Sequence, residues 1–160
     1  MTLEMYPSIP NTESVEPAPA DRPRLLLVEG DDVRTSRRLA NMLRDDGFSV
    51  EIARDGAHAI ARFMRAPYPD VLVSELSVGQ ADLSALARFV RAQRPGLPIV
   101  IVTSRPNAVR EQELGEPEPL VFTKPIDYFV LREALLTAVR QCPRSSQPSL
   151  EAAPSDQSMR

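Results

Sequence analysis

The sequence predicts an α/β protein with a doubly wound, five-stranded parallel sheet in the order 2-1-3-4-5. Short apolar runs alternate with amphipathic segments five times between Arg24 and Val139. The first run, residues 24–28, is apolar throughout after Arg24, as expected of a strand that is covered on both faces. Short connections favour right-handed crossovers, and the chain must reverse direction once to cover both faces of the sheet.

Five apolar runs are expected to form the strands: residues 24–28, 48–53, 71–73, 97–102 and 120–122. The fourth run is the richest in β-branched residues, which favour strands. A helix is expected after each strand, at about residues 33–46, 56–66, 83–90, 106–114 and 127–139.

Helix-capping and turn residues define the first two helices. Asp31 or Asp32 can cap the first helix, and Gly47 suits the left-handed conformation that ends it. Asp55 opens the second helix, which Pro67 stops.

The remaining helices have similar signals. Asp82 is expected to cap the third helix, and Pro95 with Gly96 forms the turn after it. Residues 106–114 have a poor apolar face for a helix. Asp127 begins the last one.

Composition limits the class of protein. The chain has 160 residues, which suits one domain, and a net charge of -3, which argues against nucleic acid as the primary partner. The single Cys142 cannot form an internal disulfide, and no Cys/His cluster predicts a zinc site. We find neither a secretory signal nor an apolar run long enough to span a membrane, so we expect a cytoplasmic protein without a membrane partner.

Both ends of the chain are rich in proline and polar residues. We predict disorder for residues 1–23 and 142–160, around one domain at residues 24–141. The alternative for either arm is a docking segment that becomes ordered on a partner.

The predicted strand order places a crevice between the carboxyl ends of the first and third strands. Glu29 and Glu75 follow or end these strands, so both are expected to line the crevice. Acidic side chains at such an edge are candidates for a catalytic or ligand-binding role.

Five segments occur in an order and spacing that matches a known family: Val28-Glu29-Gly30-Asp31-Asp32, Asp55-Gly56-Ala57-His58-Ala59, Pro69-Asp70-Val71-Leu72-Val73-Ser74-Glu75, Val102-Thr103-Ser104 and Thr123-Lys124-Pro125. Over roughly residues 24–141 the chain therefore resembles the receiver domain of bacterial response regulators, a CheY-like domain with a flavodoxin-like fold.

The resemblance implies a role for each matched position. Glu75 stands at the phosphoacceptor position, and Thr103 at the hydroxyl position that senses the phosphoryl group. Lys124 and Pro125 match the Lys-Pro signature, and Val121 stands where a switch aromatic is usual. The acidic pocket of the family, which holds Mg²⁺, corresponds to residues Glu29, Asp31 and Asp32.

Several departures from the family pattern argue against phosphorylation. Glu75 is one methylene longer than the usual aspartate, and Val78-Gly79 replaces the customary Met-Pro. Gly30 stands where a metal-ligating acid is usual; if Gly30 is an insertion, Asp31 takes that place. We therefore expect no cofactor, with Glu29 and Asp31 as the ligand candidates if Mg²⁺ does bind. Lys124 is expected to form an ion pair with Glu75, which either imitates the phosphorylated state or leaves the site inert.

The predicted function is that of an atypical, non-enzymatic, single-domain response regulator, which signals by phosphorylation-independent protein contact. By resemblance, the partner docks on the face formed by the fourth helix, fifth strand and fifth helix, and a homodimer through that face is a second option. The alternatives are a phosphorylatable receiver in a two-component phosphorelay, a scaffold acting through its tails, and a small metal-assisted hydrolase. For the hydrolase, the sequence shows neither a nucleophile nor a glycine-rich phosphate loop, and His58 is expected to face solvent.

Overall fold

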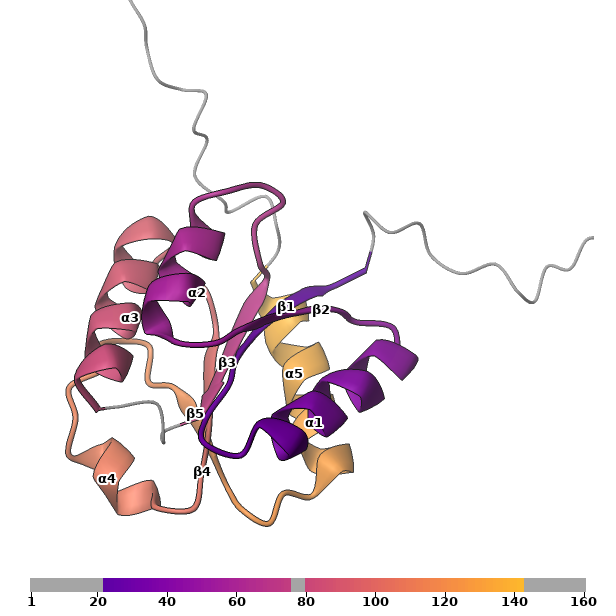
Figure 1. The fold of residues 1–160 in the computed structure, drawn as a ribbon. Helices are drawn as coiled ribbons and strands as arrows, with labels where there is room; N and C mark the ends of the chain where they lie inside the picture. Colours follow the sequence, from indigo (N-terminus) through magenta and orange to yellow (C-terminus); the bar gives the residue numbers. More distant parts are fainter. Residues whose placement is uncertain (1–21, 76–79, 143–160) are drawn as a thin grey trace, which may run out of the picture.

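The computed structural model describes residues 22–75 and 80–142, which form five strands and five helices (Figure 1). The strands are β1 (Arg24–Val28), β2 (Ser49–Ala53), β3 (Val71–Glu75), β4 (Ile99–Thr103) and β5 (Leu120–Thr123). The helices are α1 (Val33–Asp45), α2 (Gly56–Phe63), α3 (Gln80–Gln93), α4 (Pro106–Arg110) and α5 (Tyr128–Gln141).

The strands form one parallel sheet in the order β2-β1-β3-β4-β5, which confirms the predicted fold class. The register pairs Val28 of β1 with Ser74 of β3, and Glu75 of β3 with Val102 of β4. The carboxyl ends of these strands therefore meet at one edge of the sheet, where Glu75 lies.

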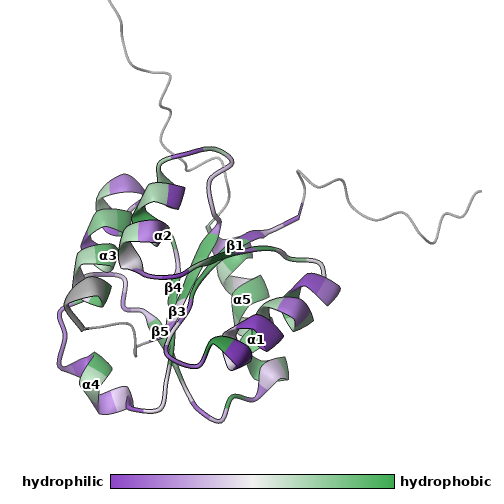
Figure 2. Cartoon of the chain, in the orientation of Figure 1, coloured by the Kyte–Doolittle hydropathy of each residue, from purple (hydrophilic) through white to green (hydrophobic). Residues whose placement is uncertain are grey.

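Helices cover both faces of the sheet. Figure 1 shows α1 and α5 on one side of the strands and α2, α3 and α4 on the other. Leu27 packs in a buried cluster with Leu43 of α1 and Leu131 of α5, whereas its neighbour Val28 joins Phe63 of α2 in the second cluster. Successive strand residues thus serve opposite halves of the core, and Figure 2 shows the strands as a hydrophobic layer between the helices.

The predicted cap of the first helix is confirmed, and Asp127, the predicted start of the last helix, is its N-cap. The Asp32 carboxylate accepts a hydrogen bond from the Thr35 N–H at 3.1 Å, and the Asp127 carboxylate accepts one from the Phe129 N–H at 3.1 Å. Gly47 adopts a φ of 101°, the left-handed conformation expected after α1.

Several helix boundaries differ from the prediction, including the end of α2, which lies at Phe63. Helix α3 begins at Gln80, so Asp82 lies in its first turn and is not its cap. An acidic residue is favourable at either place, because both lie near the positive end of the helix dipole, and the sequence could not separate them. Helix α4 ends at Arg110 and not at Leu114, since its weak apolar face cannot sustain a longer helix.

The predictions for residues 1–21, 143–160 and Val78-Gly79 lie outside the described residues. Within the described part of the chain, none of the helices has both the length and the apolar character needed to span a membrane.

Candidate functional site

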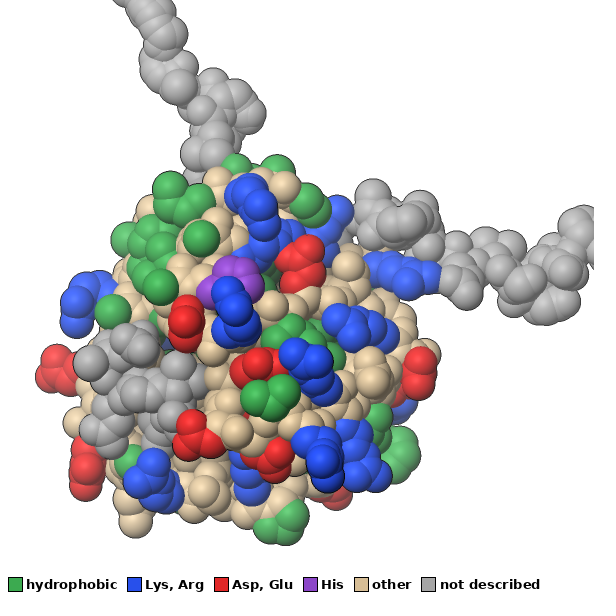
Figure 3. All heavy atoms as spheres, in the orientation of Figure 1, with side chains coloured by type: hydrophobic (Ala, Val, Ile, Leu, Met, Phe, Trp, Pro, Cys, Tyr) green, Lys and Arg blue, Asp and Glu red, His purple; other side chains and the backbone are tan. Residues whose placement is uncertain are grey.

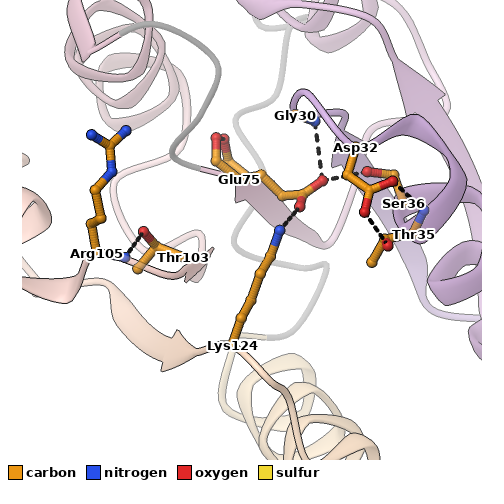
Figure 4. A network of polar contacts seen from close by, with 9 residues as sticks. Gly30, Asp32, Thr35, Ser36, Glu75, Thr103, Arg105 and Lys124 are labelled. Atoms are coloured by element: carbon orange, nitrogen blue, oxygen red, sulfur yellow. Dashed lines mark hydrogen bonds and ion pairs between the residues drawn. The ribbon is translucent and has the colours of Figure 1, made fainter.

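The site lies at the carboxyl edge of the sheet, where four strands bring polar residues together. Glu75 is the last residue of β3 and Thr103 is the last residue of β4. Glu29 follows β1 directly, and Lys124 follows β5 directly. Figure 4 shows Lys124 and the start of α1 converging on Glu75 from opposite sides. The topology thus unites residues that are far apart in the sequence.

Glu75 is buried, with 3% of its surface exposed, and both of its carboxylate oxygens accept hydrogen bonds. Oε2 accepts one from Lys124 Nζ at 2.5 Å. Oε1 accepts one from the Gly30 N–H at 3.0 Å and another from the Ser36 hydroxyl. A buried carboxylate needs such donors, because an unpaired charge away from water is costly. The predicted pair between Glu75 and Lys124 is present in the structure.

Lys124 reaches Glu75 from a fixed backbone position. Its N–H donates to the Thr103 carbonyl at 2.9 Å, which extends the β4–β5 pairing by one residue. Its side chain is 28% exposed, so one side of the ammonium keeps contact with solvent. Pro125 follows it and is exposed. Lys124 is also the only lysine in the sequence.

Thr103 is buried, and its hydroxyl accepts a hydrogen bond from the Arg105 N–H at 2.8 Å. This bond shapes the turn from β4 into α4, for which Arg105 is the residue before the first helical one. Figure 4 shows this pair apart from the donors that surround Glu75. The hydroxyl predicted to sense a phosphoryl group thus has a role in the backbone turn.

The three acidic residues after β1 are not gathered into one cluster. Glu29 is buried and pairs with Arg37 of α1 at 3.2 Å, whereas Asp31 is exposed. Asp32 accepts hydrogen bonds from both the hydroxyl and the N–H of Thr35. These two bonds, the hydroxyl bond first, hold the pKa of Asp32 below its ordinary value.

Three carboxylates that could take part in binding a magnesium ion, those of Glu29, Asp32 and Glu75, already have partners. Mg²⁺ needs several free oxygen ligands in near-octahedral geometry. Here the Glu29 carboxylate binds Arg37, the Asp32 carboxylate binds Thr35, and the Glu75 carboxylate already accepts three hydrogen bonds. Among residues 22–75 and 80–142, no group of three or more His, Cys, Asp or Glu residues could hold a metal ion.

Two other predicted positions lie outside this cluster of donors. Val121, at the position of the family's switch aromatic, is 38% exposed on β5, while Phe122 turns the other way and packs against the core. His58 is exposed on α2, and its Nδ1 accepts a hydrogen bond from the Arg54 N–H at 3.1 Å. That bond uses one ring nitrogen to hold the turn before α2.

Ser36 is the site residue that the sequence analysis missed. It is 1% exposed, and its hydroxyl donates to Glu75 across 39 residues of sequence. A signal was available: Ser36 precedes Ala40 and Leu43 by one and two helical turns, and all three face the core. A polar residue on a buried helix face needs a partner, and the nearby strand end supplies one.

Replacing Ser36 with alanine is expected to lower the free energy of unfolding by about 1–2 kcal/mol, because Glu75 loses a buried hydrogen bond to a charged group. Urea denaturation measures the change. The matched control is Ser104→Ala, which alters an exposed serine and should change stability by less than about 0.5 kcal/mol. Equal effects of the two substitutions would show that the Ser36 hydroxyl does not support Glu75.

Comparison with models of protein families gave no match. The chain is 30% identical over 123 residues to the transcriptional regulatory protein GlrR of Escherichia coli strain K12, an alignment that covers 75% of this chain and 27% of GlrR. The chain thus spans about a quarter of the length of that curated relative.

Solved structures share the fold. A sensor protein from Polaromonas sp. JS666 superposes with a TM-score of 0.62 and 29% identity, covering 76% of this chain and 99% of that one. A CheY-like response regulator receiver domain protein from Methanospirillum hungatei JF-1 superposes with a TM-score of 0.61 and 20% identity, covering 75% of this chain and 95% of that one. Together with the strand order and the polar residues at the carboxyl edge of the sheet, these similarities show that the chain belongs to the CheY-like receiver-domain family of response regulators.

Proposed function

We propose that this receiver domain works in two-component signalling as a pseudo-receiver, which acts by protein contact and does not accept a phosphoryl group at Glu75. The observation that carries the proposal is the occupied carboxylate. Lys124, Gly30 and Ser36 together hold both oxygens of Glu75. In a working receiver those oxygens would have to be available to the metal ion and the incoming phosphorus atom.

The charge balance of the site supports the same conclusion. Phosphoryl transfer depends on positioning and on cations that neutralise the developing charge. The Lys124 ammonium already neutralises Glu75 at 2.5 Å, and the extra methylene of a glutamate carries the carboxylate toward that lysine. The site thus contains a permanent pair of charges where a receiver would alternate between two states.

The docking face of the proposal comprises α4, β5 and α5. Four apolar residues on β5 and the first turn of α5 are exposed: Leu120, Val121, Phe129 and Val130. Exposed apolar side chains of this size favour a protein contact, since burying them on a partner is favourable. A cytoplasmic signalling protein is the proposed partner, and a homodimer through the same face is the second candidate.

Treatment with acetyl phosphate and Mg²⁺, followed by intact mass measurement, tests the proposal. The chain is expected to gain no phosphoryl group. The matched variant carries Glu75→Asp together with Gly30→Asp, which shortens the acceptor and restores an acid beside it; we expect it to gain some Mg²⁺-dependent label. A phosphoryl gain by the unaltered chain that EDTA abolishes would overturn the proposal in favour of a phosphorylatable receiver.

A further inference from the structure

A hollow of about 780 Å³ lies between the end of α4 and β5, on the docking face. Its apolar lining includes Val109 and Leu114, which are buried, and Leu120 and Val121, which are exposed. β5 is an edge strand of the sheet, and none of the other strands in residues 22–75 and 80–142 covers this side. The hollow therefore offers an apolar floor to a partner.

The early end of α4 creates the hollow, and an arginine maintains it. After Arg110 the chain runs to β5 without a helix or strand. Arg91 of α3 donates hydrogen bonds to the carbonyls of Leu114 and Pro117, which fixes this connection from the side. Gly115 lies between them at a φ of 81°, and a Cβ there would come within 3.1 Å of the Arg91 side chain. These hydrogen bonds hold the wall of the hollow in place in the chain alone, before any partner binds.

The rim of the hollow is acidic. Residues 111–118 have the sequence Glu-Gln-Glu-Leu-Gly-Glu-Pro-Glu, which contains four glutamates and no basic residue. All four glutamates are exposed, and three of them, Glu113, Glu116 and Glu118, line the hollow. Arg110 also lines the hollow, so the charged lining consists of three glutamates and one arginine. Its net negative charge favours a partner of the opposite charge.

The arms of this chain have the wrong charge for the hollow. Residues 1–21 contain four acidic and no basic residues, so the acidic rim would repel them. Residues 143–160 contain two basic and two acidic residues and have no basic cluster. Neither arm therefore has the basic character that the hollow favours in an occupant.

We infer that this acidic hollow binds a basic segment of a partner protein, in which apolar side chains alternate with arginine or lysine. The inference rests on the proposed function, since it names the chemistry of the partner at the proposed docking face. The apolar side chains cover Leu120 and Val121, while the cations pair with the glutamates on the rim. Binding should weaken as salt is raised, because the rim charges are exposed.

The test is fluorescence anisotropy of the full chain with a short fluorescein-labelled peptide in which leucines alternate with arginines. Two peptides of the same length serve as controls, one with glycine for leucine and one with glutamate for arginine. The arginine–leucine peptide should bind about tenfold more tightly than either control, because each control lacks one of the two kinds of contact. If the glycine peptide bound as tightly as the arginine–leucine peptide, the binding would be non-specific charge attraction. That result would contradict the inference.

Matched variants locate the site. Glu113→Gln with Glu118→Gln, and separately Leu120→Asn, should each weaken peptide binding by about fivefold, as expected for two rim charges or one exposed apolar contact. Asp45→Asn with Glu133→Gln removes the same charge elsewhere, and Met64→Asn alters another exposed apolar residue. These controls should leave the affinity within about twofold. If the controls weaken binding as much as the variants, the hollow is not the site.

A second copy of the chain is the competing occupant. The exposed face of α1 carries Arg34, Arg37 and Arg38, and Figure 3 shows basic side chains gathered over the part of the molecule where α1 lies. Sedimentation of the chain alone separates the two cases. If the chain self-associates and the Glu113→Gln, Glu118→Gln variant does not, the occupant of the hollow is a second copy of the chain. That result would contradict the inferred basic partner. A monomer that binds the peptide supports the inference.

The inference and the proposed function can fail separately. If the chain gains a phosphoryl group and also binds the peptide, the proposed pseudo-receiver function is wrong and the inferred docking site is supported. If the chain gains no phosphoryl group and does not bind the peptide, the pseudo-receiver function is supported and the inferred basic partner is wrong.

Discussion

Replacing Lys124 with methionine is expected to lower the free energy of unfolding by about 3 kcal/mol, because the substitution leaves the buried Glu75 carboxylate without its counter-charge. This value lies at the low end for breaking a buried ion pair, since the Lys124 side chain is 28% exposed and water shares in its solvation. A loss of this size is a large part of the stability of a small domain. Urea denaturation followed by circular dichroism measures it.

A double-substitution cycle separates the pair from the general cost of each change. Glu75→Gln alone is expected to cost about 1 kcal/mol, since the part-exposed ammonium keeps its water. The double variant should be more stable than the sum of the two single losses predicts, by about 2 kcal/mol. Arg38→Met, which removes an exposed cation from α1, should cost less than about 0.5 kcal/mol. Additive losses in the cycle would show that Lys124 and Glu75 do not stabilise each other.

The fold and the central ion pair could be predicted because short segments of the sequence contain the patterns and motifs that indicate them. Continuous apolar runs predicted the strands, and the rule that ligands gather at the carboxyl ends of parallel strands predicted where Glu75 would lie. The pairing of Lys124 with Glu75 was predicted from the resemblance of Lys124 and Pro125 to the family's Lys-Pro signature, and the parallel sheet places both residues at one edge. The caps by Asp32 and Asp127 followed from residue type and position.

The remaining features depend on contacts between segments that are distant in the sequence. The hydrogen bond from Ser36 to Glu75 spans 39 residues, and the bond from Arg91 to the Leu114 carbonyl spans 23 residues. Neither pair belongs to a motif. For Ser36 the sequence signals only a polar residue on a buried helix face, and the folded arrangement identifies its partner. Arg91 thereby fixes the connection after α4, whereas the early end of α4 itself follows from its weak apolar face.

The reactivity of Lys124 reports directly on its pairing with Glu75. Lys124 is the only lysine of the chain, so a peptide map separates its acylation from that of the N-terminal amine. The ammonium must leave the Glu75 carboxylate before the amine can attack an acylating reagent. A charge-assisted hydrogen bond contributes about 1.5–3 kcal/mol, and each 1.4 kcal/mol corresponds to a factor of ten. The bond should therefore slow acylation by about tenfold or more.

The decisive measurement is the acylation rate of Lys124 by an N-hydroxysuccinimide acetate reagent, followed by mass spectrometry in the unaltered chain and in Glu75→Gln. We expect Glu75→Gln to react at least about tenfold faster, since the amine is released from its carboxylate. Glu133→Gln, which removes a carboxylate paired with Arg132 on α5, should react at the unaltered rate. Equal rates for the unaltered chain and Glu75→Gln would contradict the claim that Glu75 and Lys124 hold each other at the position that corresponds to the phosphoacceptor.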